Sequence, residues 1–560
     1  MGYGHAGQAF TLAFLASLRE LTFTVFMTKP DFSRREFLKL AGLLALAPAL
    51  RYLPAAQPAA QGERPNIIVI INDALCAFHL NTYGYPRNTS PNLDRFAAHA
   101  TVFHNHHSAG NFTTPSTASL FTGLYPWTHR AFNLNSLVVP AERPHNLFAP
   151  LHEQYHIAAF TQNVFVDTLL YQFEEYIASH PGLDSFSRAG HTFYNHLFPN
   201  DAIYGMKGYD QLLFKREEAH GSLLASLLND LAVQANQRLQ SQSVTDLYPA
   251  GLPRLANTDV YYMLGEVMAG VTGLLTNLPQ PNFTYIHLLP PHAPYAPARA
   301  YQALFDDGWS PPPKKKHRLA AGVAQPRLDA QRRTYDQFIA NIDDEFGRLL
   351  QTIENAGLLE NSYIFYTSDH GEIFERGAAG HSMPLLFEPN IRVPLFVHAP
   401  GQQQRQDVHA LTSNVDLLPT FLYLAGLPPA EWAAGRALPG LGGAENAPER
   451  DVFVVEAKAN AAQQPLRKAS LALIRWPYKL VHYLGYRYYS DNYELYDLQN
   501  DPEELQNLYP DHPMAAELQA ELDAAAAEAD KPYVALTPNP SPGGGGESAP
   551  PPPSGEGAGG

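Results

Sequence analysis

The chain has 560 residues, of which 45% are hydrophobic and 11% aromatic, so it can bury a large core and form more than one domain. Only 16% of the residues are charged, and the formal net charge of −16 argues against nucleic acid as a partner, because binding phosphates requires basic surface. A single cysteine, Cys76, excludes an internal disulfide framework and a zinc site built from several cysteines.

Residues 1–62 are interpreted as an N-terminal extension with a signal peptide. Ser33–Lys39 carries paired arginines, and the apolar run Leu40–Leu50 is too short to cross a bilayer as a helix. Small residues at 54–60 then offer a signal peptidase site. The segment resembles a bacterial twin-arginine signal, which predicts export by that machinery to the periplasm or the cell exterior, with no membrane span in the mature protein. The alternative is an apolar surface helix with two chance arginines.

Two predicted strands end in acidic residues. The β-branched run Asn66–Ile71 has the pattern of a strand buried on both faces of a parallel sheet, and Asp73 follows it. A helix over 335–356 precedes a second strand, Tyr363–Tyr366, which leads to Asp369 and His370. Ligands bind at the carboxyl ends of such strands. A buried carboxylate needs a compensating cation, and a divalent metal is the simplest one.

The segment 111–123 predicts a short helix. Thr114 is expected to cap it, with Pro115 in the first turn and Gly123 at its end. Thr113 then lies at the helix N-terminus, where unpaired N–H groups favour an anion. Taken locally, Thr-Thr-Pro is a common helix start without functional meaning. With Thr113, the two aspartates and the histidine form a ligand set that suits zinc, manganese, magnesium or calcium.

Nine short stretches occur in an order that resembles the sulfatase family of the alkaline phosphatase superfamily, over nearly all of residues 64–525. They are Asp73–Tyr85, Thr89–Arg95, Pro115 with Thr122–Pro126, Pro291–Tyr295, Asp369–Glu372, Gly380–His381, Ile391–Leu395, Val415–Thr420 and Glu494–Asp497. The resemblance implies a mainly parallel α/β sheet between helices over 63–435, and a smaller subdomain of antiparallel sheet plus helix over 436–536. The Pro- and Gly-rich residues 537–560 are predicted to be a disordered tail.

The resemblance also implies roles for single residues. Asp73, Asp369 and His370 match the family's metal ligands, and Thr113 falls at the position of its nucleophile. His292 and His381 match positions that contact the substrate anion or the leaving group, so both are expected to be catalytic or substrate-binding, together with the Thr113–Thr114 helix start. His292 is equally well interpreted as a satisfied histidine of a proline-rich loop.

The chain departs from the family at its nucleophile. Typical sulfatases oxidise a cysteine or serine there to formylglycine, whereas Thr113 cannot be converted in this way, so no formylglycine is expected. The arginine of the same motif is replaced by Thr117. Threonine nucleophiles occur in relatives that handle phosphorus, including phosphodiesterases, and this favours a phosphate ester over a sulfate ester as the substrate.

Three functions remain open from the sequence. The first is a metal-dependent hydrolase of a sulfate or phosphate ester that acts through a covalent Thr113 intermediate, on a small molecule or on an anionic glycan or lipid. The second is an extracytoplasmic transferase of the phosphoglycerol or phosphoethanolamine type. The third is a degenerate family member that binds an anion without turnover.

Two polar runs invite further interpretation. His104, His106 and His107 suggest a second metal, but adjacent strand positions face opposite sides, so the three cannot all converge. The basic run 311–318 is predicted to be a solvated loop, with attraction of anionic polymers as the alternative.

Overall fold

The structure is a computed structural model that describes residues 64–187, 244, 246–255, 260–381, 383–444, 450–489 and 492–534. The predicted signal peptide and the predicted C-terminal tail therefore lie outside the described residues. Within the described ranges, no helix is both long and apolar enough to traverse a bilayer.

A seven-stranded sheet forms the centre of the larger part, in the order β3-β4-β1-β5-β8-β2-β9. Only β8 runs antiparallel to its neighbours, so the sheet is mainly parallel, as predicted. The strands are β1 (Asn66–Asn72), β2 (Thr101–His107), β3 (His156–Thr161), β4 (Asn282–Leu288), β5 (Ser362–Thr367), β8 (Leu395–His398) and β9 (Gln406–Ser413).

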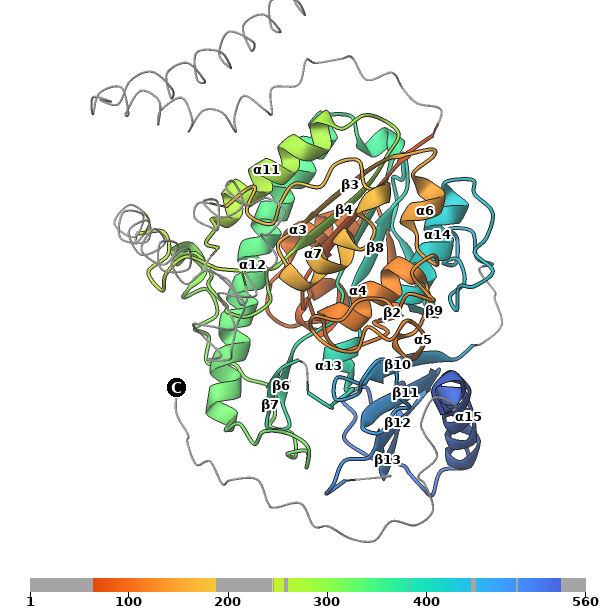
Figure 1. Cartoon of the computed structure of the whole chain (residues 1–560). Coiled ribbons are helices and arrows are strands. Elements are labelled where there is room, and N and C mark those ends of the chain that lie inside the picture. The colour runs from red at the N-terminus through yellow and green to blue at the C-terminus, as the bar shows by residue number, and fades with distance from the viewer. Residues whose placement is uncertain are drawn as a thin grey trace, which may run out of the picture. The chain divides into compact units, whose positions relative to one another are not determined.

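Helices cover both faces of this sheet (Figure 1). Ile68 and Ile70 of β1 pack toward α3, α11 and α12, whereas Ile67 and Val69 pack toward α4, α6, α7 and α14. This alternation explains the continuous apolar sequence of β1, because both of its faces are buried. The helices are α3 (Pro91–Ala97), α4 (Thr113–Thr122), α5 (Pro126–His129), α6 (Phe148–Leu151), α7 (Val164–Tyr171), α11 (Leu264–Asn277), α12 (Gln325–Asn355), α13 (Glu388–Ile391) and α14 (Leu417–Leu424).

A second, antiparallel sheet of four strands follows in the order β10-β11-β12-β13. One of its faces packs on α15 and α5, and the other packs on α13 and on the hairpin β6-β7. These elements are β6 (Ile373–Glu375), β7 (Ala378–Gly380), β10 (Val452–Glu456), β11 (Ala469–Arg475), β12 (Tyr478–Leu484), β13 (Asn492–Asp497) and α15 (Ala515–Val534). The predicted fold class is therefore confirmed.

Two local predictions need correction. The helix predicted over 335–356 begins ten residues earlier, at Gln325, because its first turns carry charged residues that show no apolar stripe in the sequence. The residue that caps α4 is Phe112, not Thr114, and both threonines lie inside the first turn. The predicted ends at Gly123 and Gly357 hold, and both glycines have positive φ angles.

Candidate metal centre and active site

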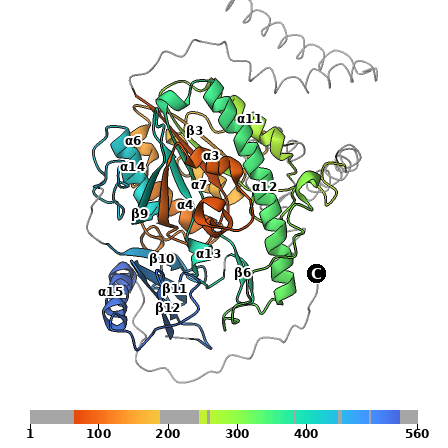
Figure 2. The ribbon, with the colours of Figure 1, turned by 180° about the vertical axis from the view of Figure 1, so that it is seen from behind.

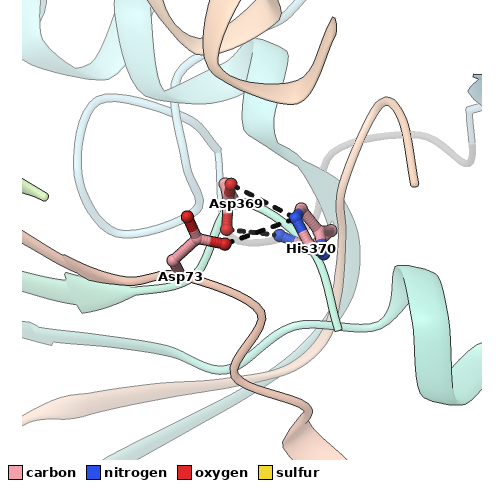
Figure 3. A group of neighbouring side chains, drawn as sticks. All are labelled: Asp73, Asp369 and His370. Carbon is pink, nitrogen blue, oxygen red and sulfur yellow. Dashed lines mark hydrogen bonds and ion pairs between the residues drawn. The ribbon is translucent and has the colours of Figure 1, made fainter. Parts of the chain in front are cut away.

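Asp73 and Asp369 meet because their strands are neighbours. β1 and β5 pair in parallel, with Ile71 opposite Thr367, so the residues that follow them emerge at the same edge of the sheet. The two carboxylates and the imidazole of His370 are fully buried and point toward one another (Figure 3). This is the only group of three or more candidate metal ligands among the residues described.

The spacing in this cluster fits a shared cation. The Nε2 atom of His370 lies 3.4 Å from Asp73 Oδ1 and 3.5 Å from Asp369 Oδ2. These separations exceed those of good hydrogen bonds, which are about 2.7–3.2 Å. They are close to the separation of two ligand atoms that bind one ion at about 2.0–2.5 Å each.

Two buried oxygens in the cluster have no hydrogen-bond partner among the described residues. They are Asp73 Oδ1 and Asp369 Oδ2, the two atoms that face His370 Nε2. A buried carboxylate oxygen without a partner is costly, so these atoms indicate a ligand between them. The donor set of oxygen and imidazole nitrogen fits a divalent metal, and suits zinc, manganese, magnesium and calcium alike.

The other carboxylate oxygens are held by the protein. Asp73 Oδ2 accepts from Asn163 Nδ2 at 2.5 Å and lies 3.3 Å from His287 Nε2. Asp369 Oδ1 accepts from the backbone N–H groups of Ala74 at 3.1 Å and His370 at 3.0 Å. Each aspartate is therefore oriented by one oxygen and presents the other to the centre of the cluster.

Backbone geometry supports this arrangement. Ala74 has a φ of +62°, in the left-handed region, and this turn brings its N–H to Asp369. His370 Nδ1 donates to the carbonyl of Gly371 at 3.0 Å, which leaves Nε2 as the free ligand atom. A Cβ at Gly371 would lie 2.1 Å from the carbonyl oxygen of Pro389, so the tight packing of this loop on α13 requires glycine.

Thr113 completes the cluster from the N-terminus of α4. Its Oγ1 lies 3.4 Å from His370 Nε2 and 3.4 Å from Asn163 Nδ2. The hydroxyl thus faces the buried carboxylates and imidazole of the cluster. Thr114 behaves differently, because its hydroxyl donates to the carbonyl of Leu134 at 2.8 Å. Only the backbone of Thr114 is then left to contact a substrate.

The two predicted histidines lie beside the metal ligands. The ring of His381 is 4.3 Å from the ring of His370, and the ring of His292 is 4.7 Å from that of His381. Glu372 binds His381 Nδ1 and also accepts from the hydroxyl of Tyr295. His292 Nδ1 donates to the carbonyl of Ala293. His381 and His292 therefore each have Nδ1 engaged by the protein, and Nε2 is the other ring nitrogen of each.

The charges shift the proton affinities of these groups. Burial raises the pKa of Asp73, but His292, His287 and His370 outweigh this effect and hold its pKa well below the usual range. Burial lowers the pKa of His292, whereas Asp73 and Glu372 raise it, and the balance is a raised pKa. Burial and the neighbouring His370 lower the pKa of His381.

The histidines on β2 do not form a second metal site. His104 Nε2 pairs with Asp407 at 2.6 Å, and His107 Nε2 pairs with Glu388 at 3.0 Å. His106 bonds to Thr412 and Asn414 instead. The three imidazoles therefore do not converge on one site, as the alternation of strand positions predicts.

Sequence reasoning missed two residues of the site, Asn163 and His287. Asn163 follows β3 and caps α7, with its side chain accepting from the backbone of Phe165, and His287 lies near the end of β4. The tyrosine hydroxyl of Tyr285 contacts His287 Nδ1 at 2.9 Å and so helps to orient that ring. The sequence did contain a signal for Asn163: the apolar run Ile157–Phe160 is followed by polar residues, which is the pattern of a strand end.

Two family models match this chain. Residues 65–427 match the sulfatase family model, and residues 381–531 match the model of the C-terminal part of N-sulphoglucosamine sulphohydrolase. The chain therefore belongs to the sulfatase family.

Individual relatives are distant. N-acetylgalactosamine-6-sulfatase of Rattus norvegicus is 24% identical over 407 residues, which cover 69% of this chain and 66% of the relative. N-acetylglucosamine-6-sulfatase of Homo sapiens is 33% identical over 197 residues, which cover 32% of this chain and 35% of the relative. The chain thus spans slightly less than two thirds of the first relative and about a third of the second.

Solved structures share the fold over almost their whole length. The phosphonate monoester hydrolase of Agrobacterium radiobacter has a TM-score of 0.59 and 20% identity, covering 83% of this chain and 95% of that chain. BT4656 in complex with D-glucosamine-2-N,6-O-disulfate has a TM-score of 0.58 and 17% identity, covering 86% and 100%. These likenesses establish the alkaline-phosphatase-like fold.

Proposed function

We propose that this chain is a metal-dependent hydrolase that cleaves a phosphate or sulfate ester through a covalent intermediate on Thr113, with phosphate esters favoured. One observation carries the proposal: the Thr113 hydroxyl lies 3.4 Å from His370 Nε2, next to two buried carboxylate oxygens without partners. A nucleophile, a cation site and a helix N-terminus are thereby brought together.

A divalent metal held by Asp73, Asp369 and His370 would supply Lewis-acid chemistry, lowering the pKa of a nearby hydroxyl and neutralising the charge of the ester. Asn163 orients the nucleophile, because its Nδ2 is fixed by Asp73 and points to Thr113 Oγ1. Asn163 Nδ2 thus donates to the nucleophilic oxygen and helps to define its position.

Bond making and breaking follow from this geometry. Thr113 Oγ1, which gives its proton to solvent water, forms a bond to phosphorus or sulfur as the bond to the leaving oxygen breaks. The N–H groups of the first turn of α4, including that of Thr114, stabilise the negative charge on the remaining oxygens. His292 or His381 contacts the anion or gives a proton to the leaving oxygen. Water then hydrolyses the Thr113 ester and restores the hydroxyl.

The single hydroxyl of Thr113 favours phosphorus chemistry. A formylglycine hydrate attacks with one hydroxyl and expels sulfate with the other, which threonine cannot do. Water must therefore break the threonine ester, and an acceptor alcohol in place of water would make the chain a transferase. A sulfate ester on a glycan is the alternative substrate to a phosphate ester. It is supported by relatives named as sulfatases of amino sugars and by a solved structure that holds a sulfated glucosamine.

We further infer export through the twin-arginine pathway to the periplasm or the cell exterior. The paired arginines and the short apolar run after them support this, and so does the similarity to an extracellular sulfatase homologue of Drosophila melanogaster, at 25% identity. Expression of the full chain in cells with and without a working twin-arginine translocase tests it. Accumulation of the protein inside the cell in both strains would contradict export.

The function is tested by assays with nitrophenyl sulfate, nitrophenyl phosphate and a bis-nitrophenyl phosphodiester, after addition of each candidate metal. We expect the phosphorus esters to be cleaved faster, Thr113→Ser to retain part of the activity, and Thr113→Ala to lose about a factor of 10⁴ in kcat/KM. Trapping followed by mass spectrometry should place the adduct on Thr113. Tight anion binding without turnover or adduct would support the non-catalytic alternative instead.

A further inference from the structure

Tyr285 and His287 of β4 lie beside the candidate metal ligand Asp73. β4 pairs with β1 in parallel, with His287 opposite Ile71. The backbone N–H of Asp73 donates to the carbonyl of Leu288 at 2.9 Å, so β4 also fixes the main chain of this ligand. Alternate residues of a strand face the same side, and Tyr285 packs on the side that α4 covers. Both side chains are fully buried, and neither belongs to the proposed ligand set.

A chain of hydrogen bonds runs from Tyr285 to the candidate ligand. The Tyr285 hydroxyl lies 2.9 Å from His287 Nδ1, and His287 Nε2 lies 3.3 Å from Asp73 Oδ2. The same carboxylate oxygen accepts from Asn163 Nδ2, which also reaches Thr113 Oγ1. Tyr285 is thereby connected, through other side chains, both to a metal ligand and to the proposed nucleophile.

The tautomer of His287 follows from its two partners. A carboxylate that binds a cation is ionised, so Asp73 Oδ2 only accepts hydrogen bonds and Nε2 of His287 must carry the hydrogen. Nδ1 of a neutral ring is then an acceptor, and the Tyr285 hydroxyl donates to it. The 3.3 Å between Nε2 and Asp73 Oδ2 exceeds the roughly 2.7–2.9 Å of charge-assisted bonds, which agrees with a neutral ring.

Packing fixes the ring of Tyr285, and with it the position of the hydroxyl. The ring centroid lies 5.0 Å from that of Phe121, at an interplanar angle of 70°. Phe121 belongs to α4, the helix that carries Thr113 in its first turn. Burial raises the pKa of Tyr285 well above its usual range, as do Asp369 and Asp73, so the hydroxyl keeps the proton that it donates. The helix of the nucleophile thus also holds the hydroxyl that orients His287.

We propose that Tyr285 and His287 are positioning residues that raise the metal affinity of the site by holding Asp73 with its Oδ1 toward the ion. The inference rests on the metal centre of the proposed function, but not on the ester that is cleaved. Without the Tyr285 hydroxyl, His287 can carry its hydrogen on Nδ1, and Nε2 then presents a lone pair to Asp73 Oδ2. Repulsion between the lone pair and the carboxylate turns Asp73 away from Asp369 and His370.

Calorimetric titration of the chelator-treated full chain with Zn²⁺ and with Mn²⁺ tests the pair. We expect Tyr285→Phe to weaken metal binding by about 10–100-fold, the range typical of hydrogen bonds to metal ligands. His287→Gln should stay within about threefold of the wild type, because its amide Nε2 donates whatever Tyr285 does. In the His287→Gln background, Tyr285→Phe should therefore have no further effect, so the two substitutions are strongly non-additive.

The matched control is Tyr366→Phe, which removes a hydroxyl from another buried tyrosine on the opposite face of the sheet. Tyr366 of β5 packs on Phe346 of α12, with ring centroids 4.6 Å apart. Figure 2 shows this face of the sheet, with α3 and α12 over it. The metal affinity of Tyr366→Phe should equal that of the wild type.

The tautomer of His287 is also measurable in the wild-type chain, so the test does not depend on the folding of Tyr285→Phe. Long-range proton–nitrogen NMR spectra of protein labelled in its histidine rings distinguish a hydrogen on Nε2 from one on Nδ1. The signal of His287 is assigned by its loss in His287→Gln. We expect the Nε2–H form with and without Zn²⁺, and a mixture of both forms in folded Tyr285→Phe.

Three results would overturn the proposal: unchanged metal affinity in folded Tyr285→Phe, an equal cost of Tyr285→Phe with and without His287→Gln, and the Nδ1–H form of His287 in the wild type. A failure of the proposed function looks different. The wild type would then bind metal and respond to these substitutions, yet release no nitrophenol and form no adduct on Thr113. A wild-type chain that binds neither Zn²⁺ nor Mn²⁺ would contradict both proposals.

Discussion

Two clusters of buried charged side chains lie close together in this protein, and they differ in where the compensating charge comes from. In the first, Asp73 and Asp369 face each other with two partnerless oxygens. In the second, Lys479 of β12 pairs with Glu388 at 2.9 Å and Glu504 at 2.5 Å. Among the described residues, a lysine pairs with the second cluster only, whereas the carboxylates of the first cluster face histidines.

The second cluster, made of His107, Glu388, Lys479 and Glu504, shows what compensation inside the protein looks like. Lys479 is fully buried and also donates to the carbonyl of Leu386 at 2.9 Å. Burial lowers the pKa of Lys479, but Glu388 and Glu504 outweigh it and raise that pKa. Burial raises the pKa of Glu504 to about 7, because one lysine cannot fully compensate two carboxylates.

The two clusters differ in the distances between their charged groups. Where the chain provides the counter-charge, the contacts are 3.0 Å or less, whereas the contacts of His370 with the two aspartates are 3.4 and 3.5 Å. Distances of the second kind leave room for an atom between the groups. The candidate metal centre is therefore distinguished by buried carboxylates that no lysine or arginine among the described residues pairs with, more than by residue type alone.

The same substitution should have opposite effects in the two clusters. Asp369→Asn removes a metal ligand and should lower kcat/KM by about a thousandfold, because metal stabilisation of the transition state is worth several kcal/mol. In metal-free protein it should raise the melting temperature, since it removes one of two buried carboxylates that have only histidines, and no lysine or arginine, as ionic partners among the described residues. Glu388→Gln should lower the melting temperature, because it leaves Lys479 undercompensated.

Thermal melts of both variants after chelation, together with assays after metal addition, measure this contrast. Equal destabilisation by both substitutions in metal-free protein would show that the aspartates are already compensated within the chain. That result would remove the main argument for the cation site.

Removal of the central cation of the second cluster should be nearly as damaging. Lys479→Met leaves the buried carboxylates of Glu388 and Glu504 without their lysine, and we expect a loss of about 3–5 kcal/mol in the free energy of unfolding, measured with urea. The matched control is Lys531→Met at an exposed pair with Glu528, where the expected change is within about 0.5 kcal/mol. The double variant Lys479→Met/Glu388→Gln should recover part of the loss, and simple additivity of the two would argue against a shared cluster.

Metal binding should stabilise the first cluster by mass action. At a free metal concentration of 100 times Kd, the free energy of unfolding should rise by about 2.7 kcal/mol. Differential scanning calorimetry of chelated protein with added zinc, manganese, magnesium or calcium also ranks the metals. Asp73→Asn is the variant that should lose this response, and a full response in that variant would place the metal elsewhere.

The sequence predicts the residues of the first cluster because their placement follows from strand ends. Parallel strands deliver Asp73 and Asp369 to one edge of the sheet, and this holds without knowledge of the full strand order. Asn163 and His287 were missed because their closeness to Asp73 depends on the order β3-β4-β1, which local patterns do not reveal.

The second cluster could not be predicted for a related reason. Lys479 and Glu388 are 91 positions apart and meet only where the antiparallel sheet packs against α13. The basic run 311–318 illustrates the same limit, since its prediction as a solvated loop is wrong for Lys314 and His317. Lys314 pairs with Glu375 and Glu503, and His317 pairs with Glu494.

A buried histidine that stays neutral provides a third case against which the two clusters can be compared. His129 lies outside both clusters, and burial lowers its pKa to about 3. Its Nδ1 accepts from the N–H of Ala131 at 3.1 Å, and its Nε2 contacts Ser119 Oγ at 3.0 Å. Protonation of Nδ1 would break the first of these bonds.

The sign of the pH effect follows from the two protonation states. Between about pH 6.5 and 3 the unfolded chain binds a proton at His129 and the folded chain does not, so stability falls as the pH falls, by about 1.4 kcal/mol per unit from this residue. In His129→Gln this contribution should vanish, although the variant is less stable at pH 7. Urea titrations at pH 7, 6 and 5 on metal-saturated protein compare the slopes. Parallel slopes for the two proteins would mean that His129 is protonated in the folded state, and that a buried imidazole in this protein can obtain its counter-charge without either cluster.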